Sequence, residues 1–497
     1  MILINSSPKD AAKIFQQFLP IYVPIGIGYL AAIMEQNGLK VKIIDEQVVD
    51  DTIAKIIKYT KELTPPYIFG FSVLTASYKS ALETSKKLKE LYPDSIIIFG
   101  GPHPTALPEE VLTNTEVDIV VKGEGELILP ELYRRLKNKH DYSDIKSISF
   151  KKGSEIIHNE KYPVITDLDT LPMFPYHLFD EIPEYDMGFI VSSRGCPHNC
   201  IFCSNRIVTG KKYRYRSPEL TIDELCYLSE KYSPKIIYFF DDNLLVNHQR
   251  IYRLMELIKE KGLHKKMKFS FQARGDNVNE ILLKDLYESG FQNIFFGLET
   301  SSDEIMKILK KGETVSQCVN AVKMAKKAGF YVSATFIYCL PTENHQIRTD
   351  CIKLANELGI DMVRFNNATP YPGTELYDIA KNEGRLNIQG LYENFNSVST
   401  FVENPFKKIP FSYVPGGNSE EEIRNDIMLS YFKFYINFKK LKRLVTKHDE
   451  GPGWFSSGKN PFDTIKKIPA LCIMSFYMAV KFLQMVFFCI KKSIFCG

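Results

Sequence analysis

Short apolar runs alternate with longer amphipathic stretches through the first 145 residues of the chain. The runs have the length of buried strands, and the stretches between them carry apolar residues at helical spacing. The expected strands are Ile2–Ile4, Val41–Ile44, Ile68–Ser72, Ile96–Phe99 and Ile119–Val121, with helices at Gly26–Asn37 and Ser77–Tyr92. This pattern predicts a doubly wound α/β domain of the Rossmann or flavodoxin type at residues 1–145.

Residues 146–186 interrupt the alternation and are expected to connect two domains. A small hairpin is predicted from Ser147–Phe150 and Glu155–His158, followed by a proline-rich stretch that restricts flexibility. We therefore expect the two domains to pack against each other, with a substrate cleft between them.

The alternation resumes with longer units at residues 187–385, as in a barrel of parallel strands surrounded by helices. The expected strands are Phe189–Ser192, Ile236–Phe240, Lys268–Gln272, Asn293–Gly297, Tyr331–Ile337 and Met362–Asn366. Such barrels place their chemistry at the carboxyl ends of the strands. The loop after the first strand of this domain is therefore expected at the face of the barrel where the chemistry takes place.

A helical extension is predicted for residues 386–497. Ser419 and Glu422 form a capping-box pattern before an amphipathic helix that is expected to continue to about Val445. Residues 468–490 are nearly continuous Leu, Ile, Val, Phe and Met, with a pair of lysines on each side. This second segment is predicted to be a hydrophobic tail helix.

The tail helix is long enough to span a bilayer, but Lys481 within it makes insertion only marginally favourable. One helical face carries a narrow polar stripe: Tyr477, Lys481, Gln484 and Phe488. A helix lying in the membrane interface is therefore favoured. A membrane span and packing on the protein's own surface stay open as alternatives.

Composition restricts the function classes. The chain has 497 residues, 44% of them hydrophobic, and a formal net charge of only +4, so nothing indicates nucleic-acid binding. Neither a signal peptide nor a disulfide framework is apparent, which predicts a cytoplasmic protein. Attachment of this protein to the membrane surface stays open. Seven cysteines are scattered singly and are expected in the core: Cys226, Cys318, Cys339, Cys351, Cys472, Cys489 and Cys496.

The other three cysteines form a C-x3-C-x2-C motif, at Cys196, Cys200 and Cys203, on a loop with glycine and proline. Three thiolates can hold a four-iron cluster while leaving one iron without a protein ligand. An open iron favours substrate or cofactor chemistry over simple electron transfer. A zinc site that recruits His198 is the alternative, as are three buried thiols.

This motif, with its Ile201-Phe202-Cys203 ending, resembles the radical S-adenosylmethionine (SAM) enzymes. The resemblance implies a partial (β/α)6 barrel, a 4Fe-4S cluster whose open iron holds SAM, and reductive cleavage of SAM to a 5′-deoxyadenosyl radical. It also implies an electron donor such as ferredoxin or flavodoxin. The implied SAM contacts are Phe202 at adenine, Asp241 or Asp242 at the ammonium, Arg274 at the carboxylate and Glu299 at the ribose.

Two details bear on these implied roles. Asp241 and Asp242 follow a strand, where a helix N-cap is an equally common use of aspartate. After the fifth strand, Cys339 and Thr342 stand where relatives usually carry glycine, so the adenine contact there is in doubt. The loop Thr369-Pro-Tyr-Pro-Gly-Thr374 does match the family's sixth-strand loop.

The loops at the carboxyl ends of the first domain's strands are rich in glycine, which permits close backbone approach to a large ligand. Four segments resemble the cobalamin-binding domain of many radical SAM enzymes: Pro24-Ile-Gly-Ile-Gly-Tyr-Leu-Ala31, Ser72-Val-Leu74, Gly100-Gly101 and Gly123-Glu-Gly-Glu126. The implied cobalamin contacts are Ser72, Leu74, Gly100, Gly101, Gly123 and Glu124. No Asp-x-His-x-x-Gly element follows the first strand, so no axial histidine is expected; a cofactor-free sheet is the alternative.

The resemblance implies a cobalamin-dependent radical SAM enzyme that removes a hydrogen atom from an unactivated carbon. We favour C-methylation of a small or lipid-like substrate. An oxidative cyclase resembling the anaerobic porphyrin-ring cyclases is the alternative, and a non-catalytic iron–sulfur and cobalamin sensor is the competing class. The sequence identifies no catalytic residue beyond the three cysteines that would bind the cluster.

Overall fold

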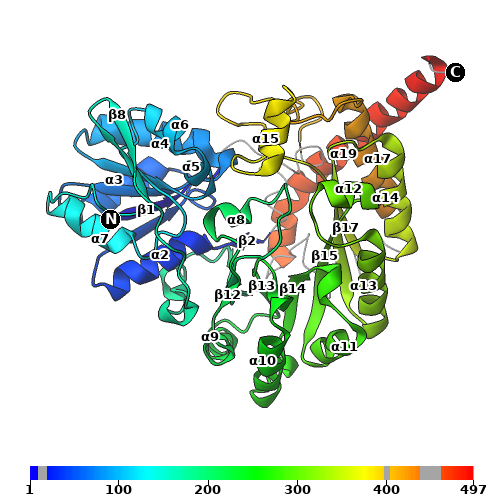
Figure 1. The fold of residues 1–497 in the computed structure, drawn as a ribbon, viewed down its shortest axis with the longest axis horizontal. Coiled ribbons are helices and arrows are strands. Elements are labelled where there is room, and N and C mark those ends of the chain that lie inside the picture. The colour runs from blue at the N-terminus through cyan, green and yellow to red at the C-terminus, as the bar shows by residue number, and fades with distance from the viewer. Residues whose placement is uncertain (9–19, 397–402, 437–460, 496–497) are drawn as a thin grey trace.

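The computed structural model describes residues 1–8, 20–396, 403–436 and 461–495. Two large sheets organise these residues, one in the N-terminal third and one in the middle of the chain (Figure 1). Helices cover the sheets, and the C-terminal helices lie beside the second one. The predicted α/β class, with a helical C-terminal extension, is confirmed.

The first sheet has seven strands in the order β3-β1-β4-β5-β6-β7-β8. Its strands are β1 (Ile2–Asn5), β3 (Lys42–Asp45), β4 (Ile68–Ser72), β5 (Ile96–Gly100), β6 (Ile119–Val121), β7 (Ile148–Lys152) and β8 (Glu155–His158). The first five of these are parallel, and their central residues are buried on both faces, as apolar runs predict. Six helices accompany them: α2 (Ile25–Gln36), α3 (Thr52–Thr60), α4 (Tyr78–Leu91), α5 (Pro102–Ala106), α6 (Pro108–Thr113) and α7 (Leu129–Lys137).

The hairpin of β7 and β8 was expected in the connector, but it extends the first sheet. Strand β7 pairs antiparallel with β6, with Phe150 opposite Ile119, and β8 pairs with β7. Ile148 and Phe150 are buried in the same apolar cluster as Ile119. The hairpin thus covers the hydrogen-bonding edge of β6 that would otherwise be exposed.

The second sheet has six parallel strands in chain order. These are β10 (Phe189–Ile190), β13 (Ile236–Phe239), β14 (Lys268–Ala273), β15 (Phe291–Glu299), β16 (Tyr331–Tyr338) and β17 (Met362–Asn367). The helices of this domain are α8 (Asn205–Val208), α9 (Pro218–Lys231), α10 (His248–Glu260), α11 (Glu280–Glu288), α12 (Asp303–Ile308), α13 (Val315–Ala328), α14 (His345–Glu357) and α15 (Glu375–Asn382). The prediction of six β/α units is confirmed.

The two domains share one apolar core. Val23 and Tyr29 of the first domain belong to the same buried cluster as the barrel residues Phe189 and Ile190. A two-stranded pairing of β2 (Ile21–Tyr22) with β9 (Tyr185–Asp186) adds backbone hydrogen bonds across the junction. The domains therefore pack directly on each other, as the proline-rich connector predicts.

The C-terminal extension closes the barrel's open edge. Helix α17 (Glu420–Tyr435) begins at Ser419, whose Oγ accepts a hydrogen bond from the Glu422 N–H. The hydroxyl of Tyr431 accepts from the N–H of Phe365, and Tyr435 bonds in the same way to Val363, so the edge of β17 is occupied. The predicted continuation to Val445 lies outside the described residues.

The tail forms helix α19 (Pro461–Phe495), which is longer than the predicted 468–490. One face packs on the protein: Lys481 is buried, the Phe482 ring meets Phe432 edge-on, and Gln484 donates to the Pro405 carbonyl. Burial lowers the pKa of Lys481 to about 8. Among the described residues, no helix has the length and apolar character needed to cross a membrane.

His103, in the short helix α5 after β5, is buried without a hydrogen-bond partner for either ring nitrogen. Its ring lies between those of Tyr78 and Tyr392, with centroids 4.2 Å and 4.9 Å away. Burial lowers its pKa to about 4. The unfolded chain therefore binds a proton near pH 6.5 that the folded protein does not take up until about pH 4, so stability falls as the pH drops through this window.

Replacing His103 by phenylalanine is expected to raise the unfolding free energy at pH 5 by about 1–2 kcal/mol, because an apolar ring needs neither hydrogen bonds nor a proton. Urea unfolding at pH 7 and pH 5 measures the change. The same replacement at His140, which is exposed, is the control. Equal acid sensitivity of wild type and His103→Phe would contradict the prediction.

Candidate active site

The three motif cysteines lie on a loop that is fixed over the carboxyl edge of the second sheet. A short ladder between β11 (Ser193–Arg194) and β12 (Arg214–Tyr215) closes the loop at its base. Gly195 has φ +84°, and a Cβ there would lie 2.3 Å from the Lys212 carbonyl, so only glycine fits. The buried Ile201 bonds through its backbone to Leu309 and Leu376. The loop is therefore held on both sides.

The three thiols are half-buried and lie within electrostatic reach of one another. Burial raises the pKa of Cys203 to about 11, and it also raises the pKa of Cys200, although the charges of Lys311 and Arg274 oppose the rise. In the described part of the chain, no three His, Cys, Asp or Glu side chains are gathered as around a single metal ion. The ligands of a 4Fe-4S cluster bind separate irons, so they need no compact set around one ion.

Asp241 binds the residues just before the cysteine loop, and Asp242 binds the loop itself. Neither aspartate caps a helix. The buried Asp241 carboxylate accepts from the N–H and Oγ of Ser192, at 2.8 and 2.6 Å, and from Ser193 Oγ at 2.5 Å. Asp242 accepts from the Gly195 N–H at 2.7 Å, and from Asn205 and Thr209. The next helix is capped by Asn247 instead, so the N-cap alternative is wrong.

The predicted contacts Arg274 and Glu299 lie at the same edge, each already held by the protein. Arg274 donates to both carboxylate oxygens of Asp276, at 2.9 and 2.8 Å, and to the Lys311 carbonyl. Glu299, with φ +59°, pairs with the buried Lys311 ammonium at 2.6 Å. Phe202 is half-buried and packs on the barrel core. SAM contacts by these residues stay predictions.

Sequence reasoning missed Lys311 and Glu313, a buried ion pair of 3.4 Å beside Glu299. Burial alone would lower the pKa of Lys311, but the two carboxylates raise it above its ordinary value. These residues lie in a loop after α12, where no motif or periodicity marks them. The Lys311 charge favours the thiolate of Cys200, and the charge of Glu299 opposes this effect.

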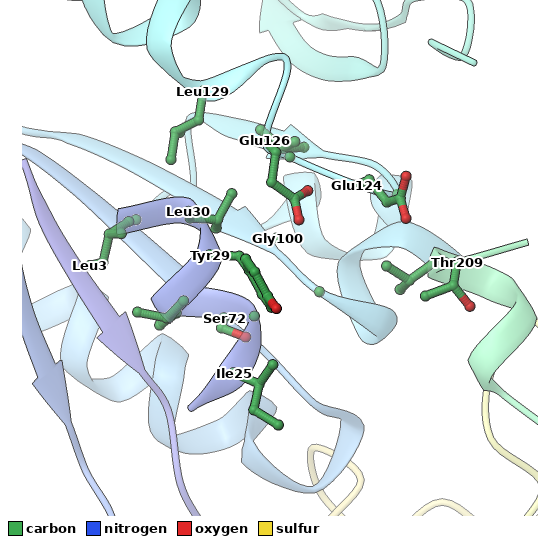
Figure 2. A pocket seen from close by; sticks show the side chains of 18 of the residues that line it. Leu3, Ile25, Tyr29, Leu30, Ser72, Gly100, Glu124, Glu126, Leu129 and Thr209 are labelled. Carbon is green, nitrogen blue, oxygen red and sulfur yellow. The ribbon is translucent and has the colours of Figure 1, made fainter. Parts of the chain in front are cut away.

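A cavity of about 300 Å³ lies between the glycine-rich rim of the first sheet and the cysteine loop (Figure 2). Ser72, Gly100, Gly101, Gly123 and Glu124 line it from the first domain, and Val191, Ser193, Arg194, Val208, Thr209, Phe240 and Asp242 line it from the second. A Cβ on Gly101, whose φ is +101°, would lie 2.9 Å from the Val73 carbonyl. Leu74 does not line this cavity: its side chain is 54% exposed, because Val73 takes the buried position after β4.

An ion-pair cluster joins the two domains at one wall of the cavity. The buried Glu124 carboxylate accepts from the Ile165 N–H at 3.0 Å and pairs with Arg214 at 2.8 Å and Arg194 at 3.3 Å. Arg194 also pairs with Glu126 at 2.7 Å and lies 5.0 Å from the centre of the Tyr29 ring. Glu124 was predicted as a cobalamin contact, and in the structure it ties the cofactor rim to the cysteine loop. In the sequence, only the position of Arg194, two residues before Cys196, could have indicated this link between Glu124 and the cysteine loop.

Two family models match the chain. The radical SAM superfamily model matches residues 190–362, and the B12 binding domain model matches residues 14–133. These ranges coincide with the domain that carries the cysteine loop and with the domain that carries the glycine-rich rim.

Individual proteins resemble the chain over most of its length. An uncharacterized methyltransferase of Pyrococcus horikoshii is 32% identical over 433 residues, 86% of this chain and 90% of that protein. An anaerobic magnesium-protoporphyrin IX monomethyl ester cyclase of Cereibacter sphaeroides is 24% identical over 425 residues, 83% of this chain and 67% of that protein.

A solved structure has the same fold. It is the radical SAM methyltransferase TsrM from Kitasatospora setae, with cobalamin and a 4Fe-4S cluster bound. The TM-score is 0.70 at 15% sequence identity, with 96% of this chain and 98% of that chain covered.

Proposed function

Because this chain belongs to the radical SAM superfamily and carries a B12-binding domain ahead of its radical SAM domain, we propose that it is a cobalamin-dependent radical SAM methyltransferase. The observation that carries the proposal is the position of Asp242. Its carboxylate accepts from the backbone of the cysteine loop and also lines the glycine-walled cavity. One residue thus borders both cofactor sites.

The residues fit the implied groups. Cys196, Cys200 and Cys203 would hold a 4Fe-4S cluster on a loop that hydrogen bonds fix at both ends. The glycine-walled cavity, with its mostly apolar lining, would hold cobalamin. When bound, the cluster and SAM supply a 5′-deoxyadenosyl radical and cobalamin carries a methyl group, with electrons from a donor such as ferredoxin or flavodoxin.

The chain's own residues orient and shield this chemistry. Asp241 and Asp242 fix the strand end and the loop that present the thiols. Lys311 supplies a buried positive charge beside Cys200. The apolar cluster shared by the domains keeps water out of the part of the junction that it fills.

The proposal is tested by measuring iron and cobalt in protein purified without oxygen from cells supplied with cobalamin. We expect about four irons and one cobalt per chain. With SAM and a strong reductant, the loaded protein should release 5′-deoxyadenosine, which a non-catalytic sensor would not. Iron without cobalt would contradict the methyltransferase and leave a cobalamin-independent radical enzyme.

A second candidate is an oxidative cyclase, favoured by the match to the cyclase of Cereibacter sphaeroides over 83% of this chain. The two candidates differ in their by-products. Methyl transfer consumes a second SAM and releases S-adenosylhomocysteine, whereas cyclisation releases 5′-deoxyadenosine alone. We favour methyl transfer because the relative with 32% identity is described as a methyltransferase.

We further propose that α19 attaches the enzyme to an anionic membrane surface, which would suit a lipid-like substrate. Its outward face exposes large apolar side chains: Ile473, Phe476, Leu483, Phe487 and Ile490. Two pairs of lysines flank this segment in the sequence, at 466–467 and 491–492. An apolar helical face between basic residues matches the chemistry of an anionic lipid interface.

The double substitution Leu483→Ser and Phe487→Ser is expected to weaken binding to phosphatidylglycerol-containing vesicles by at least about tenfold, because two apolar contacts are lost. Both side chains are highly exposed, so the fold should persist. Vesicle co-sedimentation measures the change, and Ile281→Ser, at an exposed apolar position on α11, is the control. If the wild-type protein does not co-sediment with such vesicles, membrane attachment is contradicted.

A further inference from the structure

The two faces of the six-stranded sheet differ in how they are covered. One face is packed under the surrounding helices, where Phe271, Phe296, Phe336 and Phe365 are buried. Since side chains alternate along a strand, the residues between these phenylalanines point to the opposite face, the inside of the partial barrel. The character of that inner face decides what the barrel can receive.

The inner face carries two exposed polar side chains, Gln272 and Arg364. The strand register places Gln272 opposite Phe295 and Thr335 opposite Arg364. Gln272 and Arg364 are exposed, although each lies inside a strand, and Phe295 and Thr335 are half-buried. Nearer the amino ends of the strands, Asn293 is fully enclosed. The inner face is therefore filled at one end and accessible toward the carboxyl ends.

Arg364 lies over an aromatic ring on this face. Its guanidinium carbon is 5.7 Å from the centre of the Phe295 ring, which is the geometry of a cation–π contact. A guanidinium presents its N–H groups in one plane. A planar donor fork of this kind is suited to a carboxylate or phosphate.

Aromatic rings lie between the neighbourhood of Arg364 and the cavity between the domains. Burial raises the pKa of Tyr22 strongly, and the charge of Arg364 opposes that rise, so the two groups are close enough to interact. The Tyr22 ring meets those of Phe240 and Tyr238 edge-on, with centroids 4.8 and 5.8 Å away. Phe240 in turn lines the cavity. Arg364 is thus near one end of a set of ring contacts whose other end, at Phe240, borders the cavity.

We propose that Arg364 is a specificity-determining residue that binds a carboxylate or phosphate group of the substrate. The inference rests on the proposed function and adds a substrate class: a molecule with an oxyanion at one end and an apolar part that lies along Tyr22 and Phe240. Strand β17, which carries Arg364, is at the opposite edge of the sheet from β10, which leads into the cysteine loop. The oxyanion end of the substrate would therefore be held away from the SAM site.

Benzoate and phenyl phosphate are suitable probes, because each joins an oxyanion to an aromatic ring. Isothermal titration of the anaerobically reconstituted protein is expected to show binding of at least one probe, and Arg364→Met to weaken it by at least about tenfold. Methionine retains an apolar chain against Phe295, so the fold should persist. Arg253→Met, on the outer helix α10, is the matched control. The difference between the probes distinguishes a carboxylate from a phosphate substrate.

Formation of 5′-deoxyadenosine without substrate separates this inference from the proposed function. We expect Arg364→Met to form 5′-deoxyadenosine at the wild-type rate. The SAM concentration that gives half of this rate should also be unchanged. Wild-type protein that binds neither probe, or equal affinity in wild type and Arg364→Met, would overturn the anion site. A raised SAM requirement in the variant would overturn it too, by assigning Arg364 to SAM. If the wild-type protein forms no 5′-deoxyadenosine, the proposed function is contradicted instead.

Discussion

Replacing Cys200 by alanine is expected to lower the rate of 5′-deoxyadenosine formation by at least about a thousandfold, because a cluster with only two protein ligands is not retained. Cys200 is the central cysteine of the motif and lies beside Lys311 and Arg274. Iron per chain measures the loss of the cluster, and 5′-deoxyadenosine release measures the loss of activity. Both are measured without oxygen. Both should fall together.

The control for this substitution is Cys226→Ala. Cys226 is also half-buried, but it lies on α9, away from the cavity and the cysteine loop. We expect its iron content and activity to equal those of the wild type. Full iron and full activity in Cys200→Ala would show that the motif holds no cluster, and the radical mechanism would then be wrong.

Replacing Gly100 by valine is expected to lower the cobalt content by at least about tenfold while iron and 5′-deoxyadenosine formation persist. A Cβ on Gly100 would lie 3.7 Å or more from every neighbouring atom, so the backbone tolerates a side chain. Gly100 lines the cavity (Figure 2), and valine is well suited to a strand. The added methyl groups would therefore occupy ligand space rather than disturb the fold.

Gly416→Val is the matched control, because Gly416 is exposed in the C-terminal extension and its nearest contact would be the flexible Arg385 side chain at 3.5 Å. Cobalt content should be unchanged there. Gly101→Val is not a suitable substitute, since φ +101° and the Val73 carbonyl would strain any side chain. A normal cobalt content in Gly100→Val would mean that cobalamin does not use this cavity, and loss of 5′-deoxyadenosine would mean that the two sites are not separable.

The strands could be predicted from the sequence because burial on both faces produces uninterrupted apolar runs, such as Ile96–Gly100. The pairing of β7 with β6 could not, since the hairpin looks the same in the sequence whether it stands alone or joins a sheet. Pairing depends on Phe150 meeting Ile119, a contact between residues far apart in the chain. Local patterns contain no information about such a partner.

The same distinction separates the predicted from the missed site residues. The cysteines were found because cluster ligation needs a local spacing that survives in the sequence. The partners of Glu124 are Arg194 and Arg214, 70 and 90 residues away. No periodicity connects them, so Glu124 was predicted to contact cobalamin alone. Charged residues buried between domains are visible only when the fold brings them together.

The ion-pair cluster between the domains also limits how this enzyme can be rebuilt. A hybrid that takes its first domain from a relative would leave Arg194 and Arg214 buried without Glu124 and Glu126 unless those carboxylates are transferred with it. Removing one partner of a buried ion pair typically costs about 3–5 kcal/mol. The practical unit for recombination is therefore the glycine-rich rim together with the cysteine loop, rather than either domain as a separate module.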